Sequence, residues 1–77
     1  MSDLRLDAAF QATRTFLEAA LEDLDTTKEL ADRGDHTGAL VQIAMGLRSR
    51  LNHAEVELGG VIERLEALGG QYPPPPP

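Results

Sequence analysis

The two histidines are the side chains best suited to acid–base catalysis or metal binding. His53 precedes Glu57 by four residues, so this pair falls on one side of a helix, whereas Asp32 and His36 straddle the predicted turn. Di-metal helical bundles instead use Glu-x-x-His motifs, and neither histidine follows a glutamate at that spacing. The chain has no cysteine to serve as a nucleophile or thiolate ligand. The sequence therefore predicts no enzymatic activity, no metal and no cofactor.

The charge balance argues against nucleic acid and anionic membranes as partners. Acidic residues outnumber basic ones 13 to 7, which gives a net charge of −6, whereas phosphate binding requires clustered Lys and Arg. The densest basic cluster is Arg48-Ser49-Arg50. We expect it to pair, within or between chains, with the acidic strip Glu18, Glu22, Asp23 and Asp25; an RNA contact is the alternative.

Most of the chain consists of two segments with apolar residues at alternating steps of four and three. Such a heptad pattern is typical of helices that pack lengthwise on other helices. In the second segment, residues 37–68, the pattern predicts one unbroken seam: Leu40, Ala44, Leu47, Leu51, Ala54, Leu58, Val61, Leu65 and Leu68. In the first, residues 4–33, the seam is Leu6, Phe10, Thr13, Leu17, Ala20, Leu24, Thr27 and Ala31.

The segment around Gly34 predicts a tight turn between these helices. Gly34 suits the position after a helix that adopts positive φ, and Asp35 or Thr37 can cap the next helix. Ser2 or Asp3 can cap the first helix in the same way. The short connection predicts an antiparallel helical hairpin.

Apolar residues beside both seams make the predicted apolar faces wider than a two-stranded coiled coil requires. A chain of 77 residues without disulfides or metal cannot enclose such faces alone. We therefore predict an all-α hairpin that oligomerises, as a dimeric four-helix bundle. The predicted oligomer interface comprises Leu6, Phe10, Phe16, Leu17, Leu21, Leu24, Leu40, Ile43, Leu47, Leu51, Leu58, Val61, Ile62 and Leu65.

Gly59-Gly60 departs from good helix-forming sequence, because two glycines cost about 2 kcal/mol relative to alanine. The seam keeps its register across the pair, so we expect a continuous helix. Within that helix the pair is a tolerated weak spot or a kink. The alternatives are a close-approach site for another helix or a partner backbone, and a break followed by a short third helix at Val61 to Leu68. Together with Val56, the glycines form a small outer patch that we consider a possible contact for a partner.

The hairpin is expected to fill residues 1–70, and residues 71–77 form a proline-rich tail. Five prolines favour an extended polyproline II conformation, which serves as a spacer or, through its PxxP spacing, as a ligand for an aromatic groove. No apolar run reaches the roughly 20 residues of a membrane span. We expect a soluble cytoplasmic protein.

The favoured function is that of a non-enzymatic interaction protein, a homo-oligomeric scaffold or accessory subunit. The alternative is a small acidic regulator, of the antitoxin, anti-activator or chaperone type, that folds onto a different protein. A metal-dependent bundle enzyme is a further alternative. The predicted layout also resembles the dimeric RNA-binding hairpins that control plasmid copy number, which implies an RNA-binding dimer.

Overall fold

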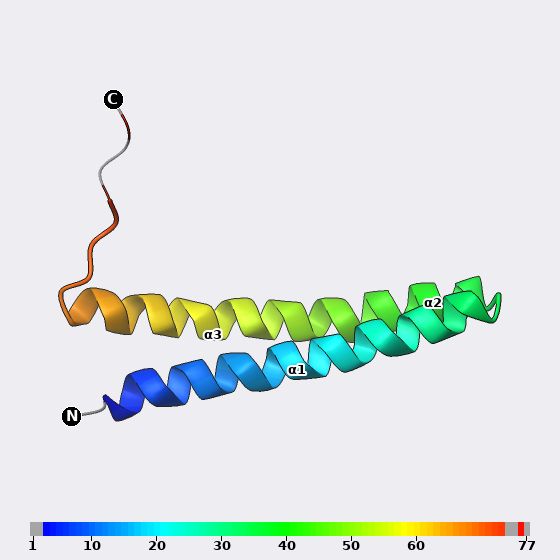
Figure 1. The fold of residues 1–77 in the computed structure, drawn as a ribbon, viewed down its shortest axis with the longest axis horizontal. Coiled ribbons are helices and arrows are strands. Elements are labelled where there is room, and N and C mark those ends of the chain that lie inside the picture. Colours follow the sequence, from blue (N-terminus) through cyan, green and yellow to red (C-terminus); the bar gives the residue numbers. More distant parts are fainter. Residues whose placement is uncertain (1–2, 74–75, 77) are drawn as a thin grey trace.

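The computed structural model describes residues 3–73 and 76, and these form an antiparallel helical hairpin (Figure 1). Helix α1 spans Leu4–Asp32, and the returning segment comprises α2 (His36–Gln42), the π-helix η1 (Ile43–Leu47) and α3 (Arg48–Ala67). The last three follow one another without interruption and form one rod beside α1. The predicted two-helix, all-α fold is confirmed, with boundaries within one residue of those expected.

Local hydrogen bonds explain where each helix begins and ends. The Asp3 carboxylate accepts a hydrogen bond from the Leu6 amide at 3.0 Å and caps α1; the alternative cap, Ser2, lies outside the described residues. At the turn, Gly34 has φ of +82°, and the Asp35 amide donates to the Leu30 carbonyl at 2.9 Å. This is the Schellman arrangement that terminates helices.

The second rod begins at the Asp35 cap and ends at a glycine. The Asp35 carboxylate accepts from the Gly38 amide at 2.9 Å, so Asp35, rather than Thr37, is the cap. Gly69, with φ of +101°, ends α3 in the same way that Gly34 ends α1. Helix α3 runs through Gly59 and Gly60 without a break, which confirms the expected continuity.

The predicted unbroken seam is wrong at the π-helix. This element adds one residue to the helical repeat, so that Ala39 is buried on the seam (8% exposed) while Leu40 is 68% exposed. A Cβ at Gly46 would lie 3.0 Å from Gln42 Nε2 and 3.3 Å from Asp23 Oδ2. The register therefore changes where a glycine lets the rod approach a polar site on α1.

The contact between the rods is lined by small side chains. Thr13, Ala20 and Thr27 recur every seven residues along α1, and Ala54 and Val61 face them from α3. Both threonine hydroxyls donate to backbone carbonyls one turn earlier at 2.8 Å, so their burial leaves no polar group unpaired. The molecule is only 15 Å thick along its shortest axis, and no large side chain among the described residues is fully buried.

Candidate functional site

The large apolar side chains lie beside the hairpin seam. On α1, Leu17 and Leu24 follow the buried Thr13 and Ala20 by four residues, and Phe10 precedes Thr13 by three. The same spacings from the buried Ala54 and Val61 on α3 give Leu51, Leu58 and Leu65. Because the rods run antiparallel, equal rotations from the seam bring both rows to the same side of the hairpin. We name this side the apolar face. Its exposed residues are Phe10, Leu17, Leu21, Leu24, Leu40, Leu51, Leu58, Ile62 and Leu65.

The side chains of the apolar face are about half accessible to water. Leu17 is 42% exposed, Leu51 46% and Phe10 50%. Their inner surfaces contact the hairpin, while their outer surfaces have no partner among the described residues. Burying a leucine completely stabilises a fold by about 1.5–3 kcal/mol, so roughly half of that stabilisation remains unused at each position.

The accessible surface of the chain is larger than its size predicts. It measures 6158 Å², whereas a compact monomer of 8.3 kDa exposes about 4,600 Å². The difference is roughly 1,600 Å², and the single-layer packing of the helices, 15 Å thick, contributes to it. Stable interfaces bury about 800 Å² on each partner, which is of the same order.

The opposite side of the hairpin is polar, and we name it the polar face. Asp23 lies at its centre, where its carboxylate accepts from Gln42 Nε2 at 3.1 Å and from Arg50 Nε at 3.3 Å. Nearby, the Phe16 ring packs edge-on against His53, with ring centroids 4.9 Å apart. These cross-rod contacts hold the π-helix and the start of α3 against α1.

A second ion pair closes the open end of the hairpin. Arg64 donates from Nε at 2.8 Å and from Nη2 at 2.5 Å to Asp3 Oδ2. The Arg64 hydrogen bond, followed by the Leu6 amide, lowers the pKa of Asp3 from 3.8 to about 2. Asp3 therefore caps α1 and also joins it to α3 while it remains ionised.

The predicted interface residues divide into three groups. Leu6, Ile43 and Leu47 are half-buried and Val61 is buried between the rods. Phe16 lies on the polar face, against His53. The remaining nine are the residues of the apolar face.

Sequence reasoning missed the site formed by Asp23, Gln42 and Gly46. A glycine within the apolar stretch, four residues after a glutamine, was the available signal. It became interpretable only once the carboxylate opposite was known.

The predicted outer patch is present as a surface feature. Val56 is 72% exposed, and a Cβ added at Gly59 or Gly60 would meet no atom within 4 Å. Packing within the chain therefore does not require these glycines. Gly60 also lines an open recess of about 330 Å³ together with Arg5, Ala9, Glu63, Arg64 and Ala67.

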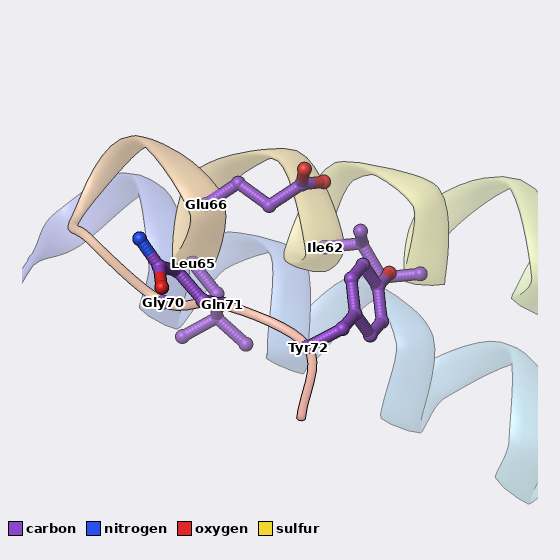
Figure 2. Close-up of a pocket in the computed structure, with 6 residues that line it drawn as sticks. All are labelled: Ile62, Leu65, Glu66, Gly70, Gln71 and Tyr72. Atoms are coloured by element: carbon purple, nitrogen blue, oxygen red, sulfur yellow. The ribbon is translucent and has the colours of Figure 1, made fainter. Parts of the chain in front are cut away.

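The segment after α3 folds back beside the end of the apolar face (Figure 2). Ile62 and Leu65 of that face form an open recess of about 270 Å³ together with Tyr72. The rest of the lining comes from Glu66, Gly70 and Gln71. Residues 74, 75 and 77 of the predicted proline-rich tail lie outside the described residues.

Comparison of the chain with protein-family models, curated proteins and solved structures gave no match. Within residues 3–73 and 76, no three His, Asp or Glu side chains gather closely enough to hold a metal ion. Among the helices described, none combines the length and apolar character needed to cross a membrane. The apolar face is thus the candidate functional site on which the following proposals rest.

Proposed function

We propose that the chain is a non-enzymatic interaction protein whose apolar face binds a second copy, forming a dimeric four-helix bundle. Such a bundle would act as a scaffold or accessory subunit in the cytoplasm. The observation that carries this proposal is the segregation of side chains in the hairpin. Small residues such as Thr13 and Ala20 hold the rods together, while large ones such as Leu17 and Leu51 face outward on one side.

A second copy of the chain would bury the side chains that a single hairpin leaves exposed on this face. Packed helices lie 8–10 Å apart, so two stacked hairpins would enclose the leucine and phenylalanine rows in one central core. The polar face is a poorer interface, because Asp23 and Arg50 already satisfy each other there. Association would also supply the core volume that the 15 Å thickness of a single hairpin does not provide.

Sedimentation equilibrium at micromolar concentration tests the proposal directly. We expect the wild-type chain to be a dimer and the double variant Leu17→Asp/Leu58→Asp to be a monomer, because a carboxylate would be buried against leucine. The control is Val56→Asp, which places the same charge on the outer patch and should remain dimeric. A wild-type chain that is folded and monomeric at this concentration would exclude self-association.

A measurement of helicity in the isolated chain distinguishes the alternative in which another protein covers the apolar face. A small acidic regulator of that kind would lack a stable core when isolated. Circular dichroism of the purified chain would then show weak helicity and no cooperative melting. An RNA-binding role is less well supported, since Arg50 is engaged by Asp23 at 3.3 Å and leaves Arg48 as the other arginine of the cluster.

A further inference from the structure

A third row of residues along each rod lies at the outer edge of the apolar face. Its residues follow the seam residues by one position along the chain. In a four-helix bundle, such residues lie between the stacked helices of the two hairpins. We name it the flanking row. Every member is exposed. On α1 the row contains Asp7, Arg14, Leu21 and Lys28, and on the second rod it contains Leu40, Arg48, Glu55 and Ile62.

The π-helix determines which residue begins this row on the second rod. Because η1 adds one residue to the repeat, the step from Leu40 to Arg48 is eight residues, whereas the later steps are seven. Without it, Val41 would occupy this position. The observed exposure of Leu40, at 68%, agrees with its place at the edge of the apolar face.

Two symmetric arrangements bury the apolar face over its full length. In one, the turns lie at the same end and α1 stacks on the partner's second rod. In the other, the turns lie at opposite ends and each rod stacks on its own copy. The axial register is fixed in both. With the turns at the same end, the two-fold axis runs parallel to the rods, so each residue keeps its level. With the turns at opposite ends, the axis is perpendicular to the rods, and full overlap requires it to pass the middle of each rod. These midpoints are near Leu17 on α1 and Leu51 on α3.

With the turns at opposite ends, three of the four pairs in the flanking row are complementary, and the fourth places Arg14 level with the partner's Leu21. Arg48 then lies level with the partner's Glu55, and Asp7 with the partner's Lys28. At its apolar positions, Leu40 lies level with the partner's Ile62. Glu18 lies outside this row but near the two-fold axis, where it comes close to the partner's Glu18. Arg14 of the same chain lies one helical turn away and can pair with it.

With the turns at the same end, the match is poor. Phe16 against His53 and Asp3 against Arg64 show which positions are level across the hairpin, and the same levels apply to a partner stacked this way. Arg14 would then face the partner's Glu55, the one favourable pair. The other three pairs would each place an apolar residue level with a charged one: Leu21 with Arg48, Ile62 with Asp7 and Leu40 with Lys28.

From this comparison we infer that two copies assemble with their turns at opposite ends, α1 on α1 and α3 on α3. The inference rests on the proposed dimer and specifies its geometry. The recess at the open end agrees with it, because the partner's Leu40 comes level with Ile62. That side chain would contact the apolar wall formed by Ile62, Leu65 and Tyr72.

Charge reversal in the flanking row tests the arrangement. Glu55→Arg should weaken dimerisation by roughly three- to thirtyfold, because it creates two like-charge contacts per symmetric dimer. Adding Arg48→Glu in the same chain should restore the affinity, whereas adding Arg14→Glu should not. Rescue by Arg14→Glu alone, or by neither change, would overturn the geometry. A wild-type chain that sediments as a monomer would instead overturn the proposed dimer.

Distance measurement gives a second readout that does not depend on affinity. The chain has no cysteine, so Thr37→Cys would carry a single spin label beside the turn of each copy. Opposite ends place the two labels roughly 45 Å apart, at 1.5 Å per residue from the two-fold axis. A distance below roughly 25 Å would show turns at the same end, because stacked helices lie within 8–10 Å, and would reject the inference.

Discussion

Removing the two central leucines of the apolar face should separate the dimer. Leu17 and Leu51 lie near the middle of their rods, and 42% and 46% of their surfaces are still exposed in one hairpin. Because burying a whole leucine stabilises by about 2 kcal/mol, each should contribute about 1 kcal/mol to association. A symmetric dimer contains two copies of both, so the double variant Leu17→Ala/Leu51→Ala should lose about 4 kcal/mol.

A loss of this size corresponds to an increase in the dimer Kd of roughly a thousandfold. The residual cavity would add to the effect, because neighbouring helices relax only partly. Dilution series in sedimentation equilibrium would measure Kd, and circular dichroism at the same concentrations would show whether the helices persist.

Val56→Ala is the matched control for this pair of substitutions. Val56 is 72% exposed, more than either leucine, but it lies on the outer patch. If exposure alone drove association, Val56→Ala would weaken the dimer as well. The reasoning is refuted if Leu17→Ala/Leu51→Ala leaves Kd within about threefold of the wild type, or if Val56→Ala has an equal effect.

Four further outcomes test the packing within one hairpin. The stabilising effect of Asp3 should be fully present above its unfolded pKa of 3.8 and should disappear as pH falls through its folded pKa of about 2. Chemical denaturation of the wild type and of Asp3→Asn at each pH would measure this effect. The difference between their unfolding free energies should fall to zero over that interval. Gly59→Ala/Gly60→Ala should raise the melting temperature, since no atom lies near either added Cβ and each glycine costs about 1 kcal/mol; lost association would instead reveal a contact at the outer patch. Gly46→Ala should gain less in the same thermal melt, because its Cβ would lie 3.0 Å from Gln42 Nε2. Asp35→Ala should lower stability by about 1 kcal/mol in denaturant titration through loss of the helix cap, and an unchanged midpoint would contradict that role.

The helices and the turn were predictable because their signals are local. Gly34 and Asp35 act on their immediate neighbours, and the observed φ of +82° at Gly34 is the conformation that its position after a helix suggested. A heptad pattern likewise reports helical rotation without knowledge of the partner. These features depend on residues within one or two turns of each other.

The division between seam and apolar face was not predicted, although the sequence contains a signal for it. A heptad pattern treats its two apolar rows alike, yet the row containing Thr13 and Ala20 is small and the row containing Phe10 and Leu17 is large. Small residues let two rods approach closely, so they form the tighter contact. Side-chain volume, read row by row, would have assigned the large row to a second contact.

The π-helix could not be found in this way, because its cause lies across the hairpin. Gly46 places no side chain against α1, and beside it Gln42 donates to Asp23 across the rods at 3.1 Å. A heptad pattern along the sequence cannot reveal a hydrogen bond to a residue 19 positions away. The sequence prediction places Phe16 in the oligomer interface for a similar reason, because its contact His53 lies 37 positions further along the chain.

The use of small residues between the rods has a consequence for how the chain folds. A seam of threonine and alanine buries little apolar area, so a single hairpin gains little free energy against the conformational entropy of its helices. The larger gain belongs to the outward rows, which become buried only when a second hairpin covers them. Under the proposed assembly, folding and association therefore share one core, and stability becomes inseparable from protein concentration. The π-helix contributes to the same end, because the register shift brings Leu40, in place of Val41, to the edge where the second hairpin would be met.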